Sequence, residues 1–150
     1  MKRWICWTAP GLAVLAADRA IKAAAAGQCR PLIPGVIGLR WTENTGMALG
    51  LFQGGTAGIL AVTAALAAVC WLLLRGMRLS GLAPVAVSLM AGGALGNLID
   101  RVALGYVQDM FELLFMRFYI FNAADVGVVT GAVLCGVSLL MRPQDWSKKP

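Results

Sequence analysis

Four long stretches of the chain are apolar over about the length needed to cross a bilayer, and this feature restricts the fold more than any other. They cover residues 4–26, 54–74, 82–99 and 118–141. A membrane-spanning helix needs about 20 apolar residues, and a helix surrounded by lipid is apolar on all sides. Only 13% of the residues are charged, against about 25% in an average soluble domain. We therefore predict an all-α membrane protein in which residues 1–150 form one integral membrane domain with four transmembrane helices.

The connections between these spans differ in length and in charge. Residues 75–81 form a short connection, whereas residues 27–53 and 100–117 form long, mixed ones. Lysine and arginine are concentrated in the short connection and at the two ends of the chain. Because positively charged loops stay in the cytoplasm, we expect both termini to be cytoplasmic and both long connections to lie on the outer side.

The first long connection contains two short apolar pieces, at residues 36–41 and 48–52. Residues 44–46, Asn-Thr-Gly, are typical of a turn between such pieces. We therefore expect a small extracytoplasmic subdomain of strands and loops at the outer membrane surface.

Composition excludes several classes of function. The net charge is +6, but the basic residues do not form a patch interleaved with aromatic side chains, so we expect no nucleic-acid partner. The chain has no histidine, and its four cysteines include no Cys-x-x-Cys pair. Zinc and haem sites are therefore not expected, and we predict no metal and no cofactor.

The polar residues within the apolar stretches fall at one depth. Asp18 lies about 21 Å along the first helix from Trp4, at ~1.5 Å per residue, and so in its outer half. The outer ends of the third and fourth spans carry further polar residues. The set is Asp18, Lys22, Asn97, Asp100, Arg101, Asn122 and Asp125. Polar groups in a membrane are costly and usually functional, so this convergence predicts one site open to the outer side.

Simpler interpretations apply to several of these residues. Asp18 and Lys22 stand four positions apart and could be no more than an ion pair. Asp100 and Arg101 could form an ordinary helix end at the interface, and residues 44–46 only a turn. Gly92 and Gly96 form a Gly-x-x-x-Gly motif, which normally marks close helix packing. Asp125 is harder to explain in this way, because no basic residue lies within four positions of it.

Two carboxylates are the catalytic groups that the sequence best provides at the depth of these polar residues. No serine lies there, and no histidine is present to activate a cysteine. Asp109 follows the third span, and Asp125 begins the fourth. Two aspartates held together share one proton, because neighbouring like charges resist double ionisation. Such a pair can activate water and polarise a carbonyl, which suits peptide hydrolysis.

Five segments, in order along the chain, resemble the signatures of the lipoprotein signal peptidase family, also called signal peptidase II. They read DRAIK at 18–22, ENTGMAL at 43–49, GGALGNLIDR at 92–101, VQDM at 107–110 and FNAAD at 121–125. The resemblance implies an aspartic endopeptidase of the bacterial cytoplasmic membrane that uses no metal. It implies cleavage of diacylglyceryl-modified prolipoproteins immediately before the lipidated cysteine. It also implies contact with membrane lipid and inhibition by globomycin-type peptides.

The resemblance assigns roles to individual residues. Asp109 and Asp125 would be the catalytic dyad, with acid and base unassigned. Residues expected to bind substrate or support the dyad are Asn44, Gly46, Asn97, Arg101, Asn122, Asp18, Lys22 and Asp100. Within that set we expect Asp18 and Lys22 to brace the site and Asp100 to hold the end of its helix.

The first motif departs from the family pattern, because Arg19 and Ile21 stand where glutamine and threonine are usual. Leu49 and Met110 replace common aromatic residues and should alter packing more than chemistry.

Two other functions fit part of the sequence. A small four-helix drug or proton exchanger would use Asp18 as its coupling residue, but its loops would be short on both sides. A catalytically inactive scaffold would keep the spans and lose the aspartates, and both aspartates are present.

Overall fold

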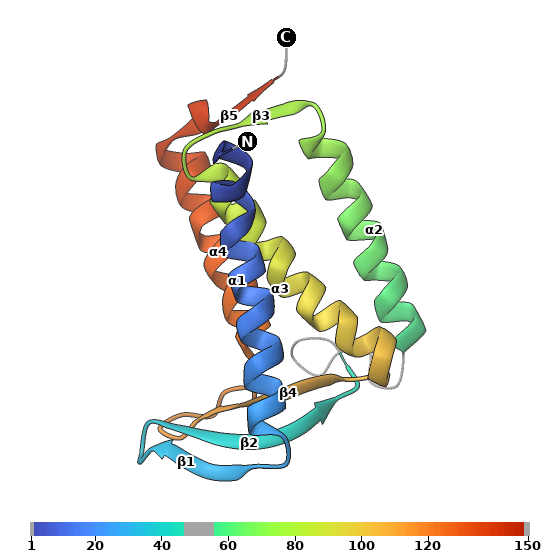
Figure 1. The fold of residues 1–150 in the computed structure, drawn as a ribbon, viewed down its shortest axis with the longest axis vertical. Helices are drawn as coiled ribbons and strands as arrows, with labels where there is room; N and C mark the ends of the chain where they lie inside the picture. The colour runs from blue at the N-terminus through green and yellow to red at the C-terminus, as the bar shows by residue number, and fades with distance from the viewer. Residues whose placement is uncertain (1, 47–55, 149–150) are drawn as a thin grey trace.

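Four helices dominate the computed structural model, which describes residues 2–46 and 56–148. They are α1 (Lys2–Ala25), α2 (Thr56–Leu74), α3 (Ala83–Leu104) and α4 (Ala123–Met141). Helix α3 packs against both α1 and α4, whereas α2 stands to one side of this group of three (Figure 1). The mostly helical fold predicted from the apolar stretches is therefore confirmed.

Three helices are long and apolar enough to cross a membrane among the residues that the structure describes. They are the helical segments Ala57–Leu74, Ala83–Leu104 and Ala123–Met141. Helix α1 is 24 residues long, but Asp18, Arg19 and Lys22 interrupt its apolar sequence. The protein is thus mostly helical, with three candidate spans and a small sheet.

Two helix ends differ from the predicted spans by more than a turn. Helix α3 runs past Ile99 to Leu104, where Gly105 ends it with a left-handed φ of 84° and donates its N–H to the Arg101 carbonyl. Helix α4 begins at Ala123 rather than at residue 118. Hydropathy did not locate these ends, because local backbone hydrogen bonds define them.

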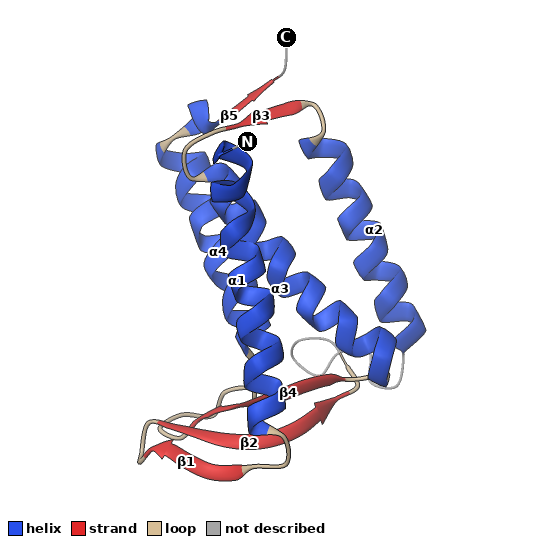
Figure 2. Cartoon of the chain, viewed as in Figure 1, coloured by secondary structure: helices blue, strands red, loops and turns tan. Residues whose placement is uncertain are grey.

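A three-stranded antiparallel sheet lies across one end of the helices (Figure 2). Its strands are β1 (Cys29–Ile33), β2 (Ile37–Asn44) and β4 (Val107–Leu113), in the order β1-β2-β4. The piece predicted at residues 36–41 is part of β2, while the piece predicted at 48–52 lies outside the described residues. Strands β1 and β4 were not predicted, and β4 brings Asp109 to the middle of the register, opposite Thr42.

The opposite end of the helices carries both chain termini and the connection from α2 to α3 (Figure 1). Strand β3 (Met77–Leu79) in this connection pairs with β5 (Trp146–Lys148). The short 3-10 helix Pro143–Asp145 precedes β5. Its buried Asp145 accepts the Leu82 N–H at 3.0 Å, just before α3 begins. The C-terminal segment is thereby joined to the start of α3.

The Gly-x-x-x-Gly motif has the packing role expected of it. A Cβ atom on Gly92 would lie 2.2 Å from the Gly11 carbonyl oxygen on α1. A Cβ atom on Gly96 would lie 3.0 Å from Asp18 Oδ2. Small residues on α3 therefore allow α1 to approach closely at two levels, and the second level is where Asp18 lies.

Candidate active site

The first turn of α4 positions Asp125. Asn122 is the N-cap residue, with extended φ and ψ of −127° and 178°. Its side-chain oxygen accepts the Asp125 N–H at 2.9 Å, while Asp125 Oδ2 accepts the Asn122 N–H at 3.1 Å. This reciprocal capping box satisfies backbone donors that would otherwise lack partners. It also fixes a carboxylate at the positive end of a helix, a favourable place for negative charge.

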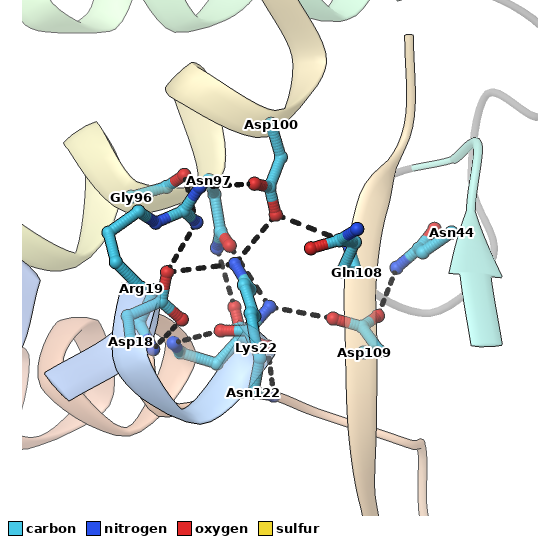
Figure 3. A network of polar contacts seen from close by, with 12 residues as sticks. Asp18, Arg19, Lys22, Asn44, Gly96, Asn97, Asp100, Gln108, Asp109 and Asn122 are labelled. Atoms are coloured by element: carbon cyan, nitrogen blue, oxygen red, sulfur yellow. Dashed lines mark hydrogen bonds and ion pairs between the residues drawn. The ribbon is translucent and has the colours of Figure 1, made fainter. Parts of the chain in front are cut away.

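Asn122 also connects Asp125 to the strand that carries Asp109. Its side-chain amide donates to Asp109 Oδ1 at 2.6 Å, and this contact is fully buried. Figure 3 shows Asn122 between α4 and β4, with Asp109 on the strand. One residue therefore contacts both aspartates, through its backbone to Asp125 and through its side chain to Asp109.

Asp109 lies in a buried position on β4, with 3% of its surface exposed. The pKa of this carboxyl is raised to about 6, mainly by burial and in part by the nearby charge of Asp125. Hydrogen bonds from Asn44 and Asn122 and the charge of Lys22 act in the opposite direction. The Asn44 amide donates to Asp109 Oδ2 at 2.9 Å. A carboxyl with such a pKa exchanges its proton close to neutral pH.

Helix α3 supplies a second asparagine to the same group. The Asn97 amide donates to Asp125 Oδ1 at 2.7 Å, and Asn97 Oδ1 accepts the Asn122 amide at 3.0 Å. One turn later, Arg101 donates to the Gly46 carbonyl at 3.1 Å. The polar residues predicted to converge on the aspartates do converge in the structure, from β2, α3, β4 and α4.

Asp18, Lys22 and Asp100 lie in a charged cluster next to this group. Lys22 Nζ pairs with Asp18 Oδ2 at 2.9 Å and with Asp100 Oδ2 at 2.7 Å. All three side chains are at most 3% exposed. The simple ion pair considered for Asp18 and Lys22 is therefore present, but it belongs to a larger cluster that also holds Asp100.

A cavity of about 750 Å³ opens onto Asp109 and Asp125. Part of its lining is polar, with Asn44, Asn97 and Arg101, and part is apolar. The apolar part comes from the segment before α4 and from the first turns of α4, and it includes Phe118, Phe121, Val126 and Val129. Phe118, Val126 and Val129 are also exposed on the surface. The cavity thus brings an apolar molecular surface up to the carboxylates.

Comparison with known proteins identifies the family. Residues 11–141 match the family model described as signal peptidase (SPase) II. This chain belongs to the signal peptidase II family. A signal peptidase hydrolyses the peptide bond that follows a signal peptide, so the predicted enzyme class is confirmed, as is the predicted removal of signal peptides from prolipoproteins.

Individual relatives support the same family assignment. The lipoprotein signal peptidase of Thermosynechococcus vestitus is 36% identical over 143 residues, covering 89% of each chain. The lipoprotein signal peptidase of Latilactobacillus sakei is 33% identical over 138 residues, covering 88% of this chain and 91% of the relative. A solved structure described as a bacterial membrane enzyme at 2.3 Å resolution superposes with a TM-score of 0.80 at 27% identity. That match covers 97% of this chain and 93% of the solved one.

Three elements of this candidate site were missed from the sequence. Arg19 was treated only as a departure from the family motif, yet it contacts Asp18, Asp100 and the Gly96 carbonyl. The backbone N–H groups of Ala124 and Gln108 are bound by Asp18 and Asp100. An acidic neighbour and apolar surroundings could have drawn attention to Arg19. Backbone donors leave no signal in a sequence.

Proposed function

We propose that Asp109 and Asp125 are the catalytic dyad of this signal peptidase II. The observation that carries the proposal is the double contact of Asn122, whose backbone N–H binds Asp125 and whose amide binds Asp109. The raised pKa of Asp109, about 6, supports a pair in which one carboxyl keeps its proton to a higher pH than an ordinary aspartate does.

In the proposed reaction, the ionised member of the pair takes a proton from water as the water oxygen attacks the scissile carbonyl carbon. The protonated member donates a hydrogen bond to the carbonyl oxygen and stabilises the charge that develops on it. When the tetrahedral intermediate collapses, the carbon–nitrogen bond breaks and the leaving amine takes up a proton from the pair. The products are the free signal peptide and a new amino terminus.

The substrate we propose is a prolipoprotein cut immediately before a diacylglyceryl-modified cysteine. A cavity that is polar at the carboxylates and apolar along α4 suits a peptide bond next to lipid chains. Asn44, Gly46, Asn97, Arg101 and Asn122 would orient the substrate and the dyad, and Asp18, Lys22 and Asp100 would brace them. Globomycin-type peptides would compete for the same cavity.

We further propose that the chain is one integral domain of the bacterial cytoplasmic membrane and that α1 is a fourth span. Its 24 residues extend about 36 Å at ~1.5 Å per residue, and it packs along α3. Arg75, Arg78 and Arg142 lie at the end that carries both termini, which favours a cytoplasmic position for that end. The sheet and the cavity would then lie at the outer face, where a lipid-anchored substrate is held.

Cleavage of a diacylglyceryl-modified prolipoprotein by purified protein in lipid tests this function. Wild type should produce the shorter lipoprotein band, and globomycin should block it. Asp109→Asn and Asp125→Asn should each lose activity by several orders of magnitude while still unfolding cooperatively. Glu112→Gln is a matched control, because Glu112 also lies on β4 but pairs with Arg40 at the surface. Turnover by a folded Asp109→Asn or Asp125→Asn protein would refute the dyad.

A further inference from the structure

Two cations and two carboxylates form a closed cluster to one side of Asp109 (Figure 3). Arg19 Nη1 contacts Asp100 Oδ1 at 2.6 Å, and Arg19 Nη2 contacts Asp18 Oδ2 at 2.5 Å. Lys22 contacts the same two carboxylates. Each cation therefore touches each anion, and the formal charges of the cluster sum to zero.

Each carboxylate of this cluster also binds a backbone N–H beside one of the proposed catalytic residues. Asp18 Oδ1 accepts the N–H of Ala124, the residue before Asp125, at 3.1 Å. Asp100 Oδ2 accepts the N–H of Gln108, the residue before Asp109, at 3.2 Å. The cluster thus holds the start of α4 and strand β4 at the positions that bear the two aspartates.

Arg19 is the member that balances this charge. Without it, Lys22 alone would face two carboxylates that are at most 1% exposed. An uncompensated buried charge is strongly unfavourable. Asp18 and Asp100 would relieve it by taking up a proton or by moving apart. Either change weakens the hold on the Ala124 and Gln108 N–H groups, since a neutral carboxyl is a poorer acceptor than a carboxylate.

Arg19 also fixes the geometry of the cluster. Its guanidinium reaches from α1 to both carboxylates and to the Gly96 carbonyl of α3 at 3.1 Å. Its side chain remains 34% exposed whereas Lys22 is buried, so Arg19 is the cation of the cluster that contacts solvent. A neutral side chain of similar length could donate to one of these acceptors, but could not pair with both carboxylates.

We propose that Arg19 is a positioning residue for the peptidase reaction, which acts through Asp18 and Asp100 on the backbone that carries the two catalytic aspartates. The proposal rests on the dyad put forward above. Arg19 touches neither aspartate of the dyad in the hydrogen bonds and ion pairs of the described residues, and so its effect should be on the arrangement of the reacting groups rather than on substrate affinity.

The test compares Arg19→Gln and Arg19→Lys with Arg30→Gln. Arg30 lies on β1, is exposed and bonds to Gln28, so its substitution removes the same charge without touching the cluster. Arg19→Gln should lower kcat on a diacylglyceryl prolipoprotein by about ten- to a hundredfold, as expected for a small displacement of reacting groups. KM should change little. Arg19→Lys, which restores the charge, should recover part of the kcat, and Arg30→Gln should behave as wild type.

A double variant addresses charge balance even if Arg19→Gln alone does not fold. Arg19→Gln with Asp100→Asn removes one cation and one anion, and the asparagine oxygen can still accept the Gln108 N–H. This protein should fold, and its kcat should exceed that of Arg19→Gln or, where Arg19→Gln does not fold, turnover should become measurable. An unchanged kcat in folded Arg19→Gln, an equal loss in Arg19→Lys, or a further loss in the double variant would overturn the role of Arg19. Activity in Asp109→Asn or Asp125→Asn would instead overturn the dyad, so the two failures are distinguishable.

Discussion

Asn122 donates its side-chain amide to Asp109 Oδ1 at 2.6 Å, in a hydrogen bond that joins the cap of α4 to strand β4. The same side chain offers its oxygen to the Asp125 N–H. A single asparagine therefore has two separable functions, one in capping the helix and one in setting the distance between the two carboxylates. Substitutions that keep one function and lose the other can distinguish them.

Asn122→Ala should lose both functions. We expect the free energy of unfolding to fall by about 1 kcal/mol through the lost cap. Catalytic efficiency should fall by about a hundredfold, because Asp109 and Asp125 are no longer held together. Thermal unfolding in detergent and initial rates on a diacylglyceryl prolipoprotein measure the two effects.

Asn122→Ser is the matched variant, since a serine oxygen can still cap the helix but its shorter side chain does not reach Asp109. Stability should return to near that of wild type while activity stays low. If activity and stability recovered together in this variant, the bond to Asp109 would have no separate catalytic role.

The buried Asp109 carboxyl should make stability depend on pH. Its folded pKa of about 6 lies above the usual value of 3.8. Between these pH values the folded protein binds more protons than the unfolded chain, so this group lowers stability as the pH rises from about 4 to about 6. The full penalty is present at neutral pH and absent below the unfolded pKa.

Asp109→Asn should therefore stabilise the protein at pH 7.5, by on the order of 1–2 kcal/mol after allowing for a disturbed hydrogen bond. The gain should shrink toward pH 5. Thermal unfolding of both proteins at the two pH values measures it. A difference that is the same at both pH values would mean that Asp109 titrates normally in the folded protein.

Hydropathy predicted the helices of this fold but not where they end. The end of α3 depends on the positive φ of Gly105, and the start of α4 depends on two hydrogen bonds of Asn122. Neither feature changes the average apolarity of a window of residues. Strand β4 was missed for a related reason, because it carries Gln108, Asp109 and Glu112 within seven residues and its main pairing partner, β2, is distant in the sequence.

Side-chain depth predicted which residues gather around the aspartates, because helix geometry converts sequence position into depth. This depth argument placed Asp18, Asn97 and Asp125 at one level. In the structure Asn97 binds Asp125, and Asp18 binds the N–H of the residue before Asp125. The sequence could not reveal that Asp18 binds the N–H of Ala124, since every residue except proline offers such a donor. It also could not assign a partner to Arg19, because Asp100 is 81 residues away.

Asp100→Asn should test the difference between support and catalysis among the acidic residues. The substitution leaves Arg19 and Lys22 with one carboxylate, so thermal stability should fall by several degrees, but measurable turnover should remain. The comparison is with Asp109→Asn under the same conditions. A folded Asp100→Asn protein without turnover, beside an active Asp109→Asn protein, would place catalysis on Asp100 instead.

Close packing of α1 on α3 should make Gly92 intolerant of a methyl group. Its Cβ would lie 2.2 Å from the Gly11 carbonyl oxygen, so Gly92→Ala must push the two helices apart. We expect a loss of about 1–3 kcal/mol, together with lower activity because Asp18 moves with α1. Gly136→Ala on α4 is the control, since among the described residues a Cβ there meets nothing within 4 Å beyond its own helix backbone, and it should be neutral or slightly stabilising. Equal stability of the two variants would show that α1 and α3 can separate at this level without cost.

The hydrogen bond between Leu82 and Asp145, which joins the C-terminal segment to the start of α3, should affect stability but not catalysis. Buried Asp145 accepts the Leu82 N–H at 3.0 Å, and a Cβ on Gly81 would lie 2.4 Å from its Oδ2. Asp145→Ala removes the partner of that N–H, which should cost about 1–3 kcal/mol. Gln144→Ala, at the exposed neighbouring position, should cost little. Because this hydrogen bond lies at the end of the helices opposite Asp109 and Asp125, kcat per folded molecule should match wild type in both variants. A loss of kcat in folded Asp145→Ala would mean that a displacement of α3 at this end also moves Asn97 and Arg101 farther along the helix.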